Sequence, residues 1–310
     1  MSKKIIFMGT SLFAVPILES ILKSNYSVGV VYTQPAKKSK RGLKLNKSPI
    51  QSMSEKLNIE FRTPKNLKDN DEEYEFIKKM NVDLAIVVSY GQIIPKKYLS
   101  LTKKGFINIH GSILPKWRGA APIQRAIMNL DDEVGISIMK INEELDSGPV
   151  SNIYKIKLDQ DKNAQEISNK LSILAAKKIL NCIKDILEDN VKFIDQDHSK
   201  ASYAKKINKI EGKINWNEEV KKIIGKINSL FPAPSAFFTF NGERYKILKG
   251  KAGSGLGRPG EVLSSNLEIA CTKNQSLKVL EIQREGRKPQ KVNEFMLGSK
   301  IKKGSIISNV

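Results

Sequence analysis

The chain has 310 residues, 40% of them hydrophobic, so it can bury a core in one large domain or two ordinary ones, which excludes a disordered protein. It contains no run of eighteen or more apolar residues and no apolar leader segment, so we expect a cytoplasmic protein rather than one inserted in a membrane. The net charge of +21 favours a polyanionic partner such as nucleic acid or an anionic membrane surface, although a composition rich in Lys, Ile and Asn raises the charge without any function.

Short β-branched runs alternate with helical patterns over the first half of the chain, as is typical of βαβ units and a mostly parallel sheet. Strands are predicted at residues 4–8, 28–32, 84–89, 106–109 and 135–141, and helices at 15–23, 122–130 and 164–187. Asn163 and Glu166 are spaced as a capping pair for the last of these helices. We therefore predict a doubly wound, Rossmann-like α/β domain over residues 1–189.

The pattern changes after residue 189. A polar stretch at 195–200 indicates a linker, which we assign to residues 190–207. Beyond it the sequence predicts a helix at 218–229 and short strands at 236–240, 245–249, 260–264, 267–271 and 277–282. Turns rich in Gly, Pro and Asn separate these strands, which predicts a small OB-like β-barrel over residues 208–310.

Positive charge is concentrated towards the C-terminus. Residues 190–310 hold 23 cations against 11 acids, whereas residues 1–189 hold 30 against 21. The second domain is therefore the more basic one.

Two other features argue against particular cofactors. Cys182 and Cys271 lie far apart, one in a helical pattern and one in a strand pattern, so we interpret both as small buried hydrophobic residues rather than metal ligands. The turn Gly9-Thr10-Ser11 lacks the Gly-x-Gly-x-x-Gly pattern, so a nicotinamide cofactor is not indicated.

Polar side chains lie at the end of the predicted strand 106–109. Asn108 and His110 are two residues apart, so they share a face, and ligands of open α/β sheets bind beyond the carboxyl ends of the strands. The next predicted strand runs into the turn Leu145-Asp146-Ser147-Gly148, which can bring a carboxylate to the same edge. We therefore expect Asn108, His110 and Asp146 to converge.

Such a trio can catalyse acyl transfer to an amine without a metal ion. An amide can donate a hydrogen bond, an imidazole can donate or shuttle a proton, and a carboxylate can orient the imidazole or accept a proton through water. Fixed donors aimed at the oxyanion of such a reaction are worth about a hundredfold to a thousandfold each. A free α-amino group titrates near pH 8, so it needs only modest help from a base.

The run from Asn108 to Gln124, followed by the turn at 145–148, resembles the signature of folate-dependent formyltransferases. Further matches at residues 6–10, 33–35 and 88–95 extend the resemblance over essentially the whole chain. Residues 117–124 and the order of the elements are similar to the members of that family that act on the methionine of initiator tRNA. Ser11 and Ile113 replace a usual proline and leucine, and both changes leave the catalytic positions intact.

The resemblance implies transfer of a formyl group from 10-formyltetrahydrofolate to the α-amino group of methionine on initiator methionyl-tRNA, for translation initiation. Asn108, His110 and Asp146 fall on the family's catalytic positions. The positions that match its folate-contacting segments are Ser112, Ile113, Leu114, Pro115, Ser89, Tyr90, Gly91 and Ile93. No metal ion is expected.

A basic segment lies between the second predicted strand and the next helix. It contains six cations and no acid, namely Lys37, Lys38, Lys40, Arg41, Lys44 and Lys47. Such a loop suits contacts with phosphate groups. In the family, the matching loop grips the acceptor stem of the tRNA, and Arg41 matches its important arginine.

Taken singly, these features have plainer interpretations: a lone histidine on a strand is usually structural, Asp-Ser-Gly is a common turn, and charge runs are usually solvated loops. Two other functions also stay open. One is formyl transfer to an amino sugar nucleotide or to phosphoribosylglycinamide, and the other is RNA binding by a chain that has lost catalysis. The basic segment with the basic second domain favours tRNA over the small amines, and the intact trio favours an enzyme. A monomer is the default expectation, because no coiled-coil pattern is present.

Overall fold

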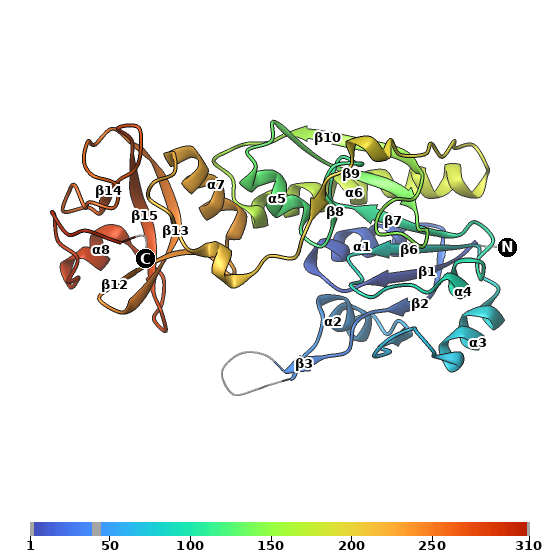
Figure 1. Cartoon of the computed structure of the whole chain (residues 1–310). Helices are drawn as coiled ribbons and strands as arrows, with labels where there is room; N and C mark the ends of the chain where they lie inside the picture. Colours follow the sequence, from blue (N-terminus) through green and yellow to red (C-terminus); the bar gives the residue numbers. More distant parts are fainter. Residues whose placement is uncertain (1–2, 39–44, 309–310) are drawn as a thin grey trace. The chain divides into compact units, whose positions relative to one another are not determined.

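The computed structural model describes residues 3–38 and 45–308, and the chain divides into two compact units (Figure 1). The first unit comprises Met1–Gly119, Val134–Ile156 and Ser168–Tyr203. The second comprises Ala120–Glu133, Lys157–Ile167 and Ala204–Val310. Two segments that precede residue 168 thus belong to the second unit.

A seven-stranded sheet forms the centre of the first unit, with the strand order β10-β9-β7-β6-β1-β2-β5. Its strands are β1 (Lys4–Gly9), β2 (Ser27–Tyr32), β5 (Phe61–Arg62), β6 (Leu84–Val88), β7 (Phe106–His110), β9 (Glu133–Lys140) and β10 (Val150–Lys157). β1 pairs in parallel with β2 and β6, and so do β6 with β7 and β2 with β5, whereas β9 runs antiparallel to β7. The prediction of a mostly parallel sheet is confirmed.

Helices cover this sheet because its strands are apolar on both faces. Ile6 and Met8 of β1 belong to one core cluster with Ile77 of α3, while Ile5 and Phe7 point to the opposite face and are equally inaccessible to solvent. The helices of the first unit are α1 (Val15–Leu22), α2 (Pro49–Lys56), α3 (Asp71–Met80) and α4 (Lys96–Leu99). α5 (Pro122–Met128) belongs to the second unit, and α6 (Ala164–Leu187) has residues in both. Four strands have only two residues each: β3 (Lys37–Lys38), β4 (Leu45–Asn46), β8 (Arg118–Gly119) and β11 (Tyr203–Ala204).

The strand order reverses direction at β1, which has β2 on one side and β6 on the other. Such a switch point is where open α/β sheets bind ligands. Hydrogen bonds join the loops there: Thr10 Oγ1 donates to the Tyr90 carbonyl (2.8 Å), and Gln34 Nε2 donates to the carbonyls of Tyr90 (3.1 Å) and Gly91 (2.7 Å). The loops that follow β1, β2 and β6 are therefore held to one another.

The second unit contains an antiparallel sheet with the strand order β12-β13-β15-β14, and β16 also pairs with β15. Its elements are α7 (Val220–Leu230), β12 (Ala236–Phe240), β13 (Glu243–Gly253), β14 (Glu268–Ala270), β15 (Ser276–Arg284), β16 (Gln290–Lys291) and α8 (Val292–Leu297). The aromatic rings of Trp216, Phe238, Tyr245 and Phe295 pack in sequence through its core.

The predicted strand at 260–264 is wrong. Glu261 and Val262 form single bridges, with Ile306 and Ile269 respectively, so the segment pairs with two partners at one residue each. Its alternating sequence suits such a half-buried position, but no continuous ladder forms.

Both cysteines are buried, as expected for small hydrophobic residues. Burial raises the pKa of the Cys271 thiol to about 12, and it also raises the pKa of the Cys182 thiol. Neither thiol is therefore primed as a nucleophile. Within the residues that the structure describes, none of the helices is both long and apolar enough to span a bilayer.

The predicted capping pair at the start of α6 is confirmed. The Asn163 N–H donates to Glu166 Oε2 (3.1 Å), and the Glu166 N–H donates to Asn163 Oδ1 (3.0 Å). The first of these bonds, supported by Lys162, lowers the pKa of the Glu166 carboxyl below its usual value.

Substitution Glu166→Ala is expected to lower the melting midpoint at neutral pH, because the Asn163 N–H loses its acceptor. A carboxyl whose pKa is lower in the folded state stabilises the protein above its unfolded-state pKa, and this contribution is lost as the pH falls through the folded-state value. The difference in midpoint between the two proteins should therefore shrink as the pH falls below about 4.

Circular dichroism melts between neutral and acidic pH measure this difference. Gln165→Ala, at an exposed position in the same turn, is the matched control. A difference between wild type and Glu166→Ala that grows on acidification would contradict the assignment.

Candidate active site

Three polar side chains of the first unit meet beside β7, as the sequence predicts. Asn108 Nδ2 donates to Asp146 Oδ1 (3.3 Å), and His110 Nδ1 lies 3.6 Å from Asp146 Oδ2. The imidazole side chain is 6% exposed and the carboxylate 16%. The carboxylate therefore touches both polar groups of the strand from a largely desolvated position.

Asp146 reaches β7 by a route that differs from the expected one. Because β9 is antiparallel to β7, its last residue, Lys140, pairs with Ile107, at the opposite end of β7 from His110. The loop 141–149 then turns back towards the polar residues. Asp146 itself adopts a left-handed backbone conformation with φ +47°. The loop, and not the end of a parallel strand, delivers the carboxylate.

The His110 ring is fixed from both sides. Its Nε2 lies 2.9 Å from the carbonyl oxygen of Trp117, and since a carbonyl can only accept, Nε2 must carry a proton. Nδ1 is then the atom that faces Asp146. A proton on Nδ1 would sit beside a carboxylate, an arrangement that suits a group that gains and loses a proton during a reaction.

Two residues without a predicted role hold the Asp146 loop. Arg118 donates from Nε (3.1 Å) and Nη2 (2.8 Å) to Gln196 Oε1, and Gln196 Nε2 donates to the carbonyls of Asp146 (2.9 Å) and Gly148 (2.7 Å). Both side chains are buried. Gln196 lies within the polar stretch 195–200, where nothing in the sequence distinguishes it from its neighbours.

The first predicted folate segment follows directly from β7 and is fixed by another residue that the sequence analysis missed. The fully buried Ser137 Oγ accepts from the Leu114 N–H (3.1 Å) and donates to the Ser112 carbonyl (2.7 Å). Ser112 Oγ donates to the Lys116 carbonyl (2.6 Å). Ile113 and Pro115 are half-buried.

The second predicted folate segment follows β6, the parallel neighbour of β7, so both segments lie at the same edge of the sheet. Ser89 (φ +47°) and Gly91 (φ +76°) adopt left-handed conformations and are exposed, whereas the Tyr90 side chain is buried. Ile93 is 88% exposed. An exposed hydroxyl and an exposed apolar side chain fit a flat ligand with an apolar face and a polar rim, as a pterin is.

The basic segment is described only at its two ends. Lys40, Arg41 and Lys44 lie outside the described residues, as does the side chain of Lys38. Lys37 is exposed and donates from Nζ to Gln34 Oε1. Lys47 is exposed and forms an ion pair with Glu55 (2.6 Å).

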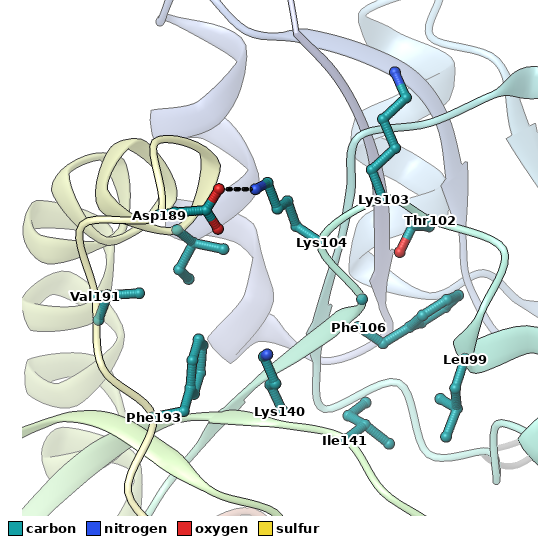
Figure 2. A pocket seen from close by; sticks show the side chains of 12 residues that line it. Leu99, Thr102, Lys103, Lys104, Phe106, Lys140, Ile141, Asp189, Val191 and Phe193 are labelled. Carbon is teal, nitrogen blue, oxygen red and sulfur yellow. Dashed lines mark hydrogen bonds and ion pairs between the residues drawn. The ribbon is translucent and has the colours of Figure 1, made fainter.

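A cavity of about 480 Å³ opens near the start of β7. Figure 2 shows the side chains that line it. Lys104 forms an ion pair there with Asp189, and Lys140 Nζ lies 4.5 Å from the centre of the Phe193 ring. Since these groups lie around the opposite end of β7 from His110, the cavity is separate from the polar trio. Among the described residues, no group of three or more His, Cys, Asp and Glu side chains is placed to hold a metal ion.

Residues 3–183 match the formyl transferase family, and residues 206–300 match the formyl transferase C-terminal domain. The chain belongs to the formyl transferase family. It is 61% identical to a methionyl-tRNA formyltransferase of Pelagibacter ubique (strain HTCC1062), over 310 residues that cover 100% of each chain.

Two solved structures share the fold. An N-formyltransferase from Helicobacter canadensis, in complex with folinic acid and dTDP-3-aminofucose, has a TM-score of 0.67 at 18% identity, over 92% of this chain and 100% of that one. HypX from Aquifex aeolicus, in complex with tetrahydrofolic acid, has a TM-score of 0.68 at 15% identity, over 98% of this chain and 49% of that one. At these identities the similarity establishes the fold.

Proposed function

We propose that this chain transfers the formyl group of 10-formyltetrahydrofolate to the α-amino group of the methionine on initiator methionyl-tRNA, in translation initiation. The convergence of Asn108, His110 and Asp146 carries this proposal. It occurs in a chain that is 61% identical, over its whole length, to a methionyl-tRNA formyltransferase.

Asn108 supplies the fixed donor. When bound, 10-formyltetrahydrofolate supplies a formyl group whose oxygen gains negative charge as an amine approaches its carbon. Asn108 Nδ2 carries two N–H groups. One donates a hydrogen bond to Asp146 Oδ1, so the other is available to donate to the formyl oxygen. The contact with Asp146 also stops the amide from rotating away.

His110 and Asp146 together can accept the proton that the amine loses. The Trp117 carbonyl holds the proton on Nε2, so Nδ1 and the facing carboxylate are the two places where a proton from the amine can be held. A protonated ring would be stabilised by Asp146 at 3.6 Å. The contacts among these three side chains support the roles proposed for them.

The folate would be held by the two segments at the carboxyl ends of β6 and β7. Ile93 and Ser89 would contact it through their side chains, and Tyr90, which is buried, through its backbone, next to Gly91. Ser112, Ile113, Leu114 and Pro115 would form the other wall. The hydrogen bonds of Ser137 to this wall support a pocket that is shaped before the ligand enters.

The tRNA would be held by the basic segment and by the second domain. We assign residues 1–189 to catalysis, 190–207 to the linker and 208–310 to a small OB-like barrel, an assignment supported by the separate family matches at 3–183 and 206–300. The antiparallel sheet of the second unit is compatible with such a barrel. The cytoplasmic location and the monomeric state stay predictions from the sequence.

The deciding assay is formyl transfer from 10-formyltetrahydrofolate to several acceptors in parallel. We expect product with methionyl initiator tRNA and far less with methionyl elongator tRNA, an amino sugar nucleotide or phosphoribosylglycinamide. Product with only a small amine would reject the tRNA substrate. Bound tRNA without any product would indicate an RNA-binding protein that has lost catalysis.

His110→Ala is expected to lower the single-turnover rate by at least about a hundredfold, because the proton that the amine loses can then no longer be held on Nδ1. Binding of methionyl-tRNA should stay close to wild type, since His110 is buried. Gln165→Ala, at an exposed position of α6, is the control. An unchanged single-turnover rate would remove His110 from the mechanism.

Arg41→Ala is expected to weaken tRNA binding and to reduce the slope of log K against log salt by about 1, the loss of one phosphate contact. Affinities at several salt concentrations measure this slope. Lys170→Ala, which removes an exposed cation from α6, should leave the slope unchanged. Equal slopes for Arg41→Ala and wild type would exclude a phosphate contact by Arg41.

A further inference from the structure

We propose that Gln196 is a positioning residue for the reaction, acting through Asp146. The starting observation is the backbone of Asp146, whose φ of +47° lies in the left-handed region. A residue other than glycine is uncommon there and stays there when its surroundings hold it. The carboxylate depends on that backbone, because a relaxed φ would turn its side chain away from Asn108 and His110.

Gln196 supplies the hold on the backbone. Its Nε2 donates to the carbonyls of Asp146 and Gly148, at 2.9 and 2.7 Å, and so closes the turn around Ser147. Gln196 is 7% exposed, so water cannot readily replace these bonds. Removing Nε2 would leave two carbonyl oxygens of the catalytic loop without this donor.

Arg118 determines which way the Gln196 amide points. The guanidinium only donates, so the amide oxygen must face it and the amide nitrogen must face Asp146. Arg118 is 2% exposed, and its backbone N–H donates to the Ser202 carbonyl (2.8 Å). The orientation of Gln196 is therefore set by a buried, fixed charge.

The next residue in the chain completes the arrangement. The Gly119 N–H donates to Asp146 Oδ2 (2.8 Å). Arg118 thus acts through Gln196 on the backbone of Asp146, while Gly119 acts directly on its carboxylate. Both ends of the aspartate are fixed from the same two-residue strand, β8, and Gln196 is the connection to the backbone.

Gln196→Glu tests this role with little change in volume. The new carboxylate keeps both bonds from Arg118, now as an ion pair, but it has no N–H for the carbonyls of Asp146 and Gly148. We expect kcat to fall on the order of 10- to 100-fold, the effect typical of a displaced catalytic group. KM for methionyl-tRNA should stay within about twofold of wild type, because substrate binding is not altered.

Two controls separate positioning from folding. Asp195→Ala changes the exposed neighbour of Gln196 and should leave kcat unchanged. If Gln196→Glu does not fold, the double variant Arg118→Met with Gln196→Leu replaces it, because an apolar pair leaves no buried charge unpaired. That protein should fold, with a lower melting midpoint because two loop carbonyls lose their donor, and it should show the same loss of kcat.

The inference rests on the proposed function, but the two can fail separately. A wild-type protein that does not formylate methionyl-tRNA would reject the proposed function, and the kcat comparison would then use the amine that it does formylate. A wild-type protein that is active, beside a folded Gln196 variant with unchanged kcat, would overturn the inference alone. If Gln196 only anchored the chain, the folded variant would keep the wild-type kcat at an assay temperature well below both melting midpoints.

Discussion

The carboxylate of Asp146 accepts hydrogen bonds from the side chain of Asn108 and from the backbone of Gly119, and it lies beside the ring of His110. These groups come from β7 and β8, and Asp146 comes from the loop after β9. The two carboxylate oxygens of Asp146 therefore hold β7, β8 and this loop in place relative to one another. A desolvated carboxylate is stable only with such donors around it. The packing of this part of the first unit and its chemistry therefore depend on the same contacts.

Much of the fold follows from patterns of short period. The apolar runs of β1 and β6 are visible in the sequence. So is the common face of Asn108 and His110, because side chains of a strand repeat every two residues. The capping pair of Asn163 and Glu166 is equally local. Each of these predictions needed only a few neighbouring residues, and the structure has each of them.

The approach of Asp146 was predicted correctly for an incorrect reason. We expected the strand before it to end at the same edge as β7, but β9 is antiparallel and ends at the other one. The sequence of β9 is apolar in either direction, so it carries no sign of strand polarity. Gln196 and Ser137 were missed for a related reason: a single polar residue becomes buried through contacts that are distant in sequence, and no periodicity reports them.

Loops on protein surfaces usually accept insertions, because lengthening a flexible connection costs little entropy. The connection 141–149 is different. A Cβ at Gly148 would lie 2.0 Å from the Lys140 carbonyl oxygen, so the loop's return is already in backbone contact with its departure point. One added residue would have to bulge outward or push Asp146 off its donors. In this family, insertions and deletions should therefore occur in other loops. This loop can change its exposed side chains but should keep its number of residues.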